Sequence, residues 1–413
     1  MDISPQNVPG LIWAMPFVGL LLAIAILPLL PKVSHWWEKN SSKLLVSLIL
    51  AAMITGYYAI RGYGFAHTEA GIGAAKTMLH HALLDDYIPF IVLLFSLYAI
   101  SGGIRFSGDV PAHPVTNSII LLAGALLASL IGTTGASMLL IRPLLQINSE
   151  RKHVTHTVIF FIFLVSNIGG ALLPVGDPPL FLGFLRGVPF FWTLHLIPHW
   201  AVAIAVLLVV YYAFDHFAYR RERPRDITLD ESTRAPLKLE GKRNFILLAL
   251  VVALIAVLVP GKPVLGTQWI APEGHLREFL QIALVALSFA WTPRHIRSGN
   301  GFNFGPMTDS ILDNAPTYTV FFELAGATPS GGAATLTRVA TATGEIPVGD
   351  LVAICVGAVF MGANTYIGNG PNFLVRGIAE SQGVKMPSFF GYMLWSGLIL
   401  IPLFVLISVI FFI

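Results

Sequence analysis

Two acidic residues stand in largely apolar sequence, each just ahead of an apolar stretch that starts with proline. Asp177 follows the charge-free residues 153–176 and precedes Pro178-Pro179, and Asp313 lies in the segment LDNAPTY (312–318). A carboxylate at membrane depth is costly and is by default functional. Two carboxylates in one low-dielectric cavity repel each other, so one holds a proton that a cation can displace. The pair therefore predicts a site that exchanges H⁺ for Na⁺ or Li⁺; the alternative is that each Asp caps the helix after it.

Amide and hydroxyl side chains gather near the same positions and could supply neutral oxygens to a cation. The amides are Asn167, Asn314, Asn364, Asn369 and Asn372, and the hydroxyls are Thr133, Thr134, Ser137, Thr317 and Thr365. Their clustering around glycine and proline favours coordination, above all for the amides 314, 364 and 369. The alternatives are hydrogen bonds between helices for the amides and bonds to the preceding helical turn for the hydroxyls. We expect all ten, with Asp177 and Asp313, to form one ion or substrate site.

The elements that position these residues must be membrane helices, because only 11% of the 413 residues are Asp, Glu, Lys or Arg. A soluble domain carries about 25%, so the composition excludes a cytosolic enzyme, a disordered chain and a nucleic-acid binder. Most of the charge-free windows approach or exceed the roughly 20 residues that cross a bilayer. They are 3–31, 44–60, 87–104, 110–141, 153–176, 187–214, 244–261, 351–375 and 386–413. We predict an all-α polytopic membrane protein whose main partner is the lipid bilayer.

The distribution of Lys and Arg sets the expected orientation. If 32–43 is cytoplasmic, counting the crossings gives internal and external segments. The internal segments hold 16 Lys and Arg and are 32–43, 105–114, 149–152, 218–243 and 293–307. The external segments hold 5 and are 61–86, 186–189 and 261–278. The positive-inside rule then places the N-terminus outside, in a multi-pass protein of the bacterial inner membrane. We divide the chain into an N-terminal repeat (1–217), a cytoplasmic linker (218–243) and a C-terminal repeat (244–413).

The two predicted repeats contain matching breaks. The stretch SNIGGALLPVGDPPLFL (166–182) has a counterpart in GANTYIGNGPNFL (362–374), and GTTGAS (132–137) has one in DNAPT (313–317). Each half thus has a re-entrant hairpin (115–148 and a shortened 308–326) and a discontinuous helix (153–187 and 350–383). Broken helices that recur in two halves point to a transporter site, because each break frees backbone carbonyls and amides at mid-membrane.

These four segments resemble the signatures of the ion-transporter superfamily, with the sodium:proton antiporter and citrate-transport branch as the most similar group. The resemblance covers nearly the whole chain and implies two inverted repeats that meet at a central site, with a scaffold part that often forms homodimers. The sequence departs from the family at FNFGPM (302–307), which runs directly into TDSILDNAPTY. One expected membrane crossing is missing there. Either 308–326 crosses the membrane once as a short helix or a segment is absent, so we expect the second repeat to be shortened.

We therefore expect a secondary active transporter, not an enzyme, with sodium:proton antiport as the leading function. The alternative is ion-coupled transport of citrate or another organic anion. No ordered nucleophile–base pair or phosphate-binding loop is present, so we expect no cofactor beyond Na⁺ and H⁺ as transported or coupling ions. Arg142, in the second arm of the first hairpin, either attracts anions or extends its charge to the inner surface.

Overall fold

The computed structural model describes residues 11–27, 30, 32–37, 39–62, 70–272, 274–304, 314–327 and 337–413. Two compact units, residues 1–89 and 90–413, make up the chain. In the first, α1 packs on α3 and α3 packs on α4. Its helical elements are η2 (Leu11–Ala14), α1 (Met15–Ile26), α2 (Ser34–Trp37), α3 (Asn40–Ile60), α4 (Ile72–His80) and the π-helical η4 (His81–Tyr87).

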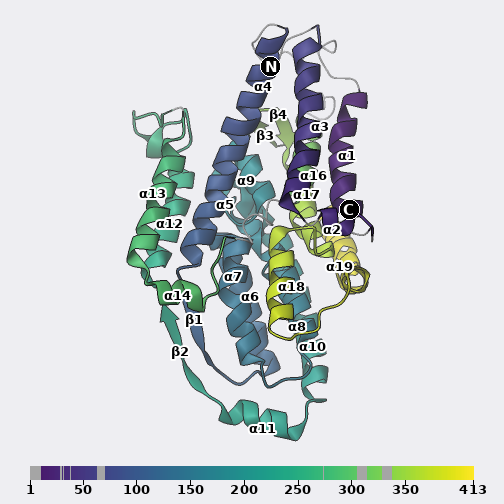
Figure 1. The fold of residues 1–413 in the computed structure, drawn as a ribbon, viewed down its shortest axis with the longest axis vertical. Helices are drawn as coiled ribbons and strands as arrows, with labels where there is room; N and C mark the ends of the chain where they lie inside the picture. The colour runs from purple at the N-terminus through teal and green to yellow at the C-terminus, as the bar shows by residue number, and fades with distance from the viewer. Residues whose placement is uncertain are drawn as a thin grey trace. The chain divides into compact units, whose positions relative to one another are not determined.

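The second unit holds all the elements that concern the candidate site (Figure 1). Those up to the linker are α5 (Ile88–Ser101, which starts two residues before the unit boundary), β1 (Arg105–Asp109), α6 (Pro114–Ile131), α7 (Thr133–Ile147), α8 (Thr155–Leu164), η5 (Ile168–Leu172), α9 (Pro178–Leu185), η6 (Phe190–Leu196) and α10 (Ile197–Tyr219). The rest are α11 (Pro224–Ser232), β2 (Ala235–Glu240), α12 (Arg243–Val257), η7 (Val264–Gly266), α13 (Leu276–Trp291), α14 (Arg294–Gly299), α16 (Ala315–Ala327), β3 (Arg338–Thr341), β4 (Gly344–Pro347), α17 (Val348–Met361), η8 (Gly362–Asn364), α18 (Gly370–Ser381) and α19 (Phe389–Phe411).

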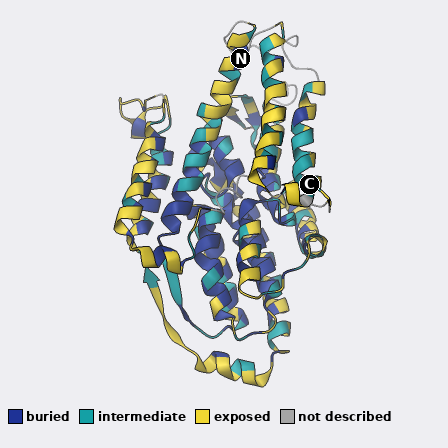
Figure 2. Cartoon of the chain, in the orientation of Figure 1, coloured by how far each residue is buried: buried dark blue, intermediate teal, exposed yellow. Residues whose placement is uncertain are grey.

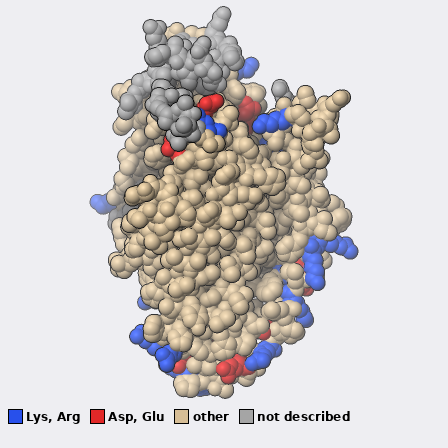
Figure 3. Space-filling model, turned by 180° about the vertical axis from the view of Figure 1, so that it is seen from behind, with Lys and Arg blue, Asp and Glu red and all other residues tan. Residues whose placement is uncertain are grey.

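The prediction of an all-α polytopic membrane protein is confirmed. Within the described residues, six helical segments are long and apolar enough to cross a bilayer. They are 40–60, 72–101, 114–131, 155–172, 190–219 and 389–411. On the face drawn in Figure 3, Lys and Arg gather toward the lower end, and a broad surface above them carries no charged side chain.

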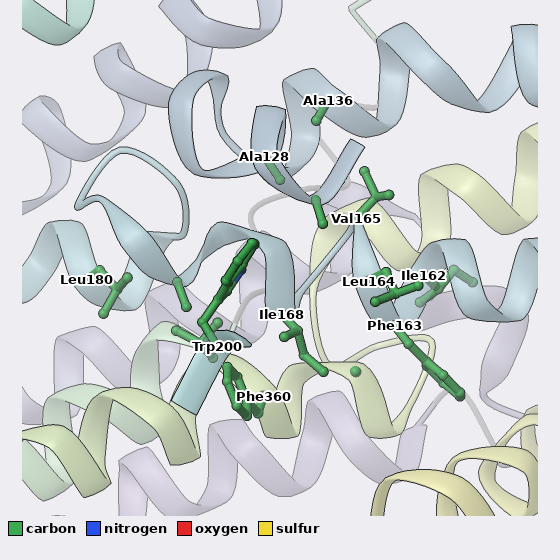
Figure 4. Packing of buried hydrophobic residues seen from close by; sticks show 14 of the residues in the cluster. Ala128, Ala136, Ile162, Phe163, Leu164, Val165, Ile168, Leu180, Trp200 and Phe360 are labelled. Carbon is green, nitrogen blue, oxygen red and sulfur yellow. The ribbon is translucent and has the colours of Figure 1, made fainter. Parts of the chain in front are cut away.

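Helix α8 is the centre of the core of the second unit. Every residue of α8 after Thr155 is buried, as expected for a helix that is apolar on all sides. Figure 2 shows the contrast between this region and the exposed surfaces of α11 and α13. Figure 4 shows Phe163 and Leu164 of α8 beside Ile168 of η5, with Phe360 of α17 nearby. The core thus joins elements from both halves of the sequence.

Helix α10 shows how an outer helix packs against this core. Its buried residues recur at spacings of three and four, which places them on one face. Val209 and Phe217 on the other face are 70% and 63% exposed, as expected for side chains that contact lipid acyl chains.

The linker 218–243 is more ordered than a solvated connection. It contains α11 and β2, and β2 pairs antiparallel with β1, so that Arg105 lies opposite Glu240. Both carboxylate oxygens of Asp230 accept hydrogen bonds from the backbone N–H of Ala112, at 3.1 Å. The linker therefore holds the chain that leads into α6.

The predicted hairpins and broken helices can be compared with the observed breaks. Gly132 separates α6 from α7 with φ +80°, a left-handed conformation that favours glycine. Helix α6 alone is long enough to count as a span, so re-entrant placement of 115–148 stays a prediction. For 308–326, residues 305–313 lie outside the described residues and α16 begins at Ala315. The inverted-repeat relation stays a prediction as well.

Candidate functional site

Asp177 lies in the connection between α8 and α9, which interrupts the predicted discontinuous helix of the first half (153–187). Helix α8 ends at Leu164, the 3-10 turn η5 follows, and Asp177 precedes α9 with extended backbone (φ −144°, ψ 140°). Its side chain makes no capping bond to α9. Pro178 and Pro179 carry no backbone N–H to donate, and the backbone N–H of Leu180 donates to the backbone carbonyl of Asp177 at 3.1 Å. The carboxylate is therefore released from the usual capping role and bonds to other elements.

Asn369 occupies the corresponding position in the second half. Helix α17 ends at Met361, the 3-10 turn η8 follows, and Asn369 precedes α18 with φ −155° and ψ 141°. Its side chain also makes no bond to the helix that it precedes. The two breaks thus present one side chain each, an acid in the first half and an amide in the second.

A close backbone crossing shapes each break in the same way. A Cβ atom on Gly176 would collide with the carbonyl oxygen of Gly170, and one on Gly368 would collide with that of Gly362. The two glycines of each pair are six residues apart in both halves, and the second of each pair directly precedes Asp177 or Asn369. Glycine is required at these positions because only a backbone without a side chain allows the chain to pass so closely.

Three side chains from three elements donate hydrogen bonds to Asp177, which is 1% exposed. Its Oδ1 accepts from Thr133 Oγ1 at 3.2 Å and from Asn369 Nδ2 at 3.1 Å, and its Oδ2 accepts from Asn314 Nδ2 at 3.0 Å. Thr133 is the first residue of α7, and Asn314 directly precedes α16. The start of α7 in the first half and the starts of α16 and α18 in the second half therefore meet at one carboxylate.

Asn167 and Asn372 tie the two breaks together behind this carboxylate. Asn167 Nδ2 donates to Asn372 Oδ1 at 2.7 Å, and Asn369 Nδ2 lies 3.2 Å from Asn167 Oδ1. Asn372 Nδ2 donates to the carbonyl oxygens of Gly362 and Thr365, each at 2.9 Å. These bonds satisfy backbone groups that an interrupted helix leaves without partners. Both residues thus hold the geometry of the centre.

Two side-chain amide oxygens near the second break accept no hydrogen bond within the described residues. Among the residues that the structure describes, no donor reaches the buried Oδ1 atoms of Asn364 and Asn369. A buried acceptor without a partner is unfavourable, and carbonyl-type oxygens are the ligands that Na⁺ takes in broken-helix transporters. We define the Asp177 centre as Asp177 with Thr133, Asn314, Asn364 and Asn369. The oxygen atoms that this centre could offer to a ligand are those of one carboxylate and of neutral side chains. Such a set of oxygen ligands fits a monovalent cation better than an anion.

The remaining predicted site residues lie in different positions. Ser137 is buried and its hydroxyl lies 2.8 Å from that of Ser166, whereas Thr134 and Thr365 are half-buried and Thr317 is exposed. No described hydrogen bond joins the side chains of these four residues to Asp177. Asp313 lies outside the described residues, so the predicted pair of acids stays a prediction.

Two groups of buried polar residues are absent from the predicted site. One is Ser166, whose backbone carbonyl oxygen accepts a hydrogen bond from Asn369 Nδ2 at 3.1 Å. Its place directly before Asn167 is the only feature of the sequence that could have indicated it. Asp215 of α10 lies 2.6 Å from Arg151 and 2.8 Å from His156 Nε2. The buried ionic network around Asp215 was missed because Asp215 stands next to the charged linker. Glu323 of α16 lies 2.8 Å from Arg186.

Comparison with known proteins gives one match. The family model described as "Putative citrate transport" matches residues 6–310 and 307–412. The two matched segments overlap at residues 307–310, next to the position where we expect one membrane crossing to be missing. No curated protein and no solved structure matched the chain.

Proposed function

The chain belongs to the family described as "Putative citrate transport" and is a membrane transporter; from this premise we propose that it couples the movement of citrate or a similar organic anion to a cation bound at the Asp177 centre. The coupling cation is Na⁺ or H⁺. We place the protein in the bacterial inner membrane with the N-terminus outside, because Lys and Arg predominate in the segments then assigned to the cytoplasm.

One observation carries the proposal: the breaks of both halves converge on a single buried carboxylate. Asp177 comes from the first half, and two of its three donors, Asn314 and Asn369, come from the second. A movement of one half against the other would separate these groups and change the affinity for a bound cation. Such a difference in affinity between two conformations is what links a ligand to a conformational change.

The charge of the centre determines which ligand binds there first. A lone carboxylate repels an unescorted organic anion and attracts a cation. Once the cation is bound, the local charge is neutral and an anion can approach. This order explains how one site serves a coupling ion and an anionic substrate, and it supports cotransport.

Sodium:proton antiport is the second candidate. The favouring observation is that Asp177 can itself hold either a proton or a cation, so the two compete for one carboxylate. In this case no organic anion takes part, and Asp313, next to Asn314 in the sequence, is the proposed second acid.

Reconstituted vesicles separate the two candidates. We expect uptake of labelled citrate when an inward Na⁺ or H⁺ gradient is imposed, and no uptake when the gradient is collapsed. Asp177→Asn should abolish gradient-dependent uptake, whereas Asp350→Asn, which changes an exposed acid at the start of α17, should not. Sodium-driven proton movement without citrate would establish antiport and refute cotransport.

A further inference from the structure

A basic cavity lies where α7 and α18 end, at the side assigned to the cytoplasm. Its volume is about 600 Å³, within the usual size of ligand pockets. Arg142, Arg151, Lys152 and Lys385 contribute to its walls, and no Asp or Glu is among its described lining residues. A cavity walled by one sign of charge concentrates ions of the opposite sign.

Arg142 differs from the other cations of this cavity. Arg151 is committed to Asp215, at 2.6 Å, and the two lysines are exposed. Arg142 is half-buried, and within the described part of the chain its Nη1 atom is buried with no hydrogen-bond partner. A desolvated guanidinium nitrogen without an acceptor is unfavourable. Carboxylates and phosphates both match the geometry of the guanidinium fork, and a carboxylate is the group that the organic anions of the proposed function carry.

The cations are not needed to cap the helices that end here. At the end of α18, the backbone N–H groups of Gln382 and Val384 donate to the carbonyl oxygen of Ala379. At the end of α7, the backbone N–H and the Nδ2 of Asn148 both donate to the carbonyl oxygen of Leu144. These terminal carbonyls have partners already, so stabilisation of helix ends does not account for the basic walls.

Arg142 also lines a second cavity, of about 220 Å³. This cavity follows α18 from Ser381 back to Gly370. Gly370 directly follows Asn369, whose Nδ2 bonds to Asp177. The guanidinium lies against Gly301, where a Cβ atom would collide with it. Arg142 therefore lines both the basic cavity and the smaller cavity, whose lining extends along α18 to the residue after Asn369.

We propose that Arg142 binds a carboxylate of a di- or tricarboxylate on the inner side of the transport route, an assignment that rests on the proposed transport of an organic anion. Lys152 and Lys385 attract the anion into the basic cavity. Arg142 then holds one carboxylate by a directed contact, because it lines both the basic cavity and the smaller cavity along α18. A second carboxylate of the ligand stays over the lysines while the first is held.

Equilibrium binding to the purified protein in lipid nanodiscs tests the site independently of transport. Labelled citrate is the probe, and wild type, Arg142→Gln, Arg142→Lys and the control Arg225→Gln, which changes an exposed linker arginine, are compared. We expect the dissociation constant for citrate to rise at least tenfold in Arg142→Gln, less in Arg142→Lys, and not at all in Arg225→Gln. Binding of Na⁺ should be the same in all four proteins, and thermal unfolding reports whether each variant is folded.

Three results would overturn the assignment. One is equal citrate binding by folded Arg142→Gln and wild type. Another is absence of saturable citrate binding to the wild type. The third is a dependence on lipid: citrate does not bind, and anionic lipid stabilises the wild type more than neutral lipid does but has no such effect on Arg142→Gln. That result would assign the site to a lipid headgroup. Arg142-dependent citrate binding without gradient-driven uptake would support this site and refute only the transport proposal.

Discussion

The glycine crossings offer the sharpest test of how the breaks are built. In Gly176→Ala the new methyl group meets the carbonyl oxygen of Gly170, and in Gly368→Ala it meets that of Gly362. Neither position has positive φ, so alanine suits the backbone conformation and the collision alone is tested. The matched control is Gly397→Ala in α19, where the structure describes no atom within 4 Å of an added Cβ.

The expected size of the effect follows from what must move. Overpacking a tight contact costs about 1–3 kcal/mol, and we expect about 3 kcal/mol because both partners at each crossing are backbone atoms. If the chain relieves this collision by shifting Asp177, the same energy appears as a loss of cation affinity of about 10²-fold. Gly397→Ala should leave affinity unchanged and raise the free energy of unfolding slightly, since alanine in a helix is favoured over glycine by about 0.5–1 kcal/mol.

Two measurements on each variant decide the matter. Denaturant unfolding in detergent gives the free energy of unfolding, and the Na⁺ dependence of vesicle uptake gives the half-saturating concentration. The collision at the breaks is refuted if Gly176→Ala and Gly397→Ala behave alike in both measurements. A loss of stability without a change in Na⁺ dependence would show that the crossing is tight but does not position Asp177.

Two further predictions concern the end of the second unit where α10 and the linker lie. Asp215→Asn removes the nearest counter-ion of the buried Arg151 and leaves it only Glu222, at 3.9 Å. The free energy of unfolding should therefore fall by about 3–5 kcal/mol, and a fall of under 1 kcal/mol in denaturant unfolding would contradict the ionic network. Burial raises the pKa of Asp230 above its ordinary value, so the folded state binds this proton more readily than the unfolded state does. Stability should therefore decrease as the pH rises from about 4 through the raised pKa; Asp230→Asn should reduce this dependence in thermal unfolding scans, and an unchanged pH profile would argue against it.

The membrane class and Asp177 could be predicted because their signals are local. A carboxylate after 24 residues without charge needs an explanation whatever the fold, and the paired GDPP and GNGP segments indicated where helices break. The exclusion of soluble protein classes is also local, because the length of each charge-free window can be compared with the thickness of a bilayer without reference to any other window. These inferences required no knowledge of which residues meet.

The partners of Asp177 could not be ranked in this way. Thr133 and Thr134 are adjacent and chemically alike, but only Thr133 bonds to Asp177, because the turn at Gly132 sets the direction of each side chain. Asn167 and Asn369 both sit in breaks, yet one ties the helices and the other donates to the carboxylate. Such roles depend on rotations of single residues within the fold, which periodicity and composition do not contain.

The ionic network of Asp215 was missed for a different reason. Arg151 and Asp215 are 64 positions apart; Arg151 stands between Glu150 and Lys152, and Asp215 stands at the end of an apolar window, just before the charged linker. Only the packing of α6, α8 and α10 brings them together. The pairing of β2 with β1 was likewise hidden, because its register depends on contacts between residues more than 120 positions apart.

Equilibrium binding of radioactive Na⁺ to the purified protein tests the central claim most directly, which is that both breaks build one cation site around Asp177. We predict saturable binding of one ion per Asp177 centre, competition by protons as the pH is lowered, and loss of this binding in folded Asp177→Asn but not in Asp350→Asn. Two results would contradict the account: saturable Na⁺ binding that persists unchanged in Asp177→Asn, or Na⁺ binding to the wild type that does not weaken as the pH is lowered.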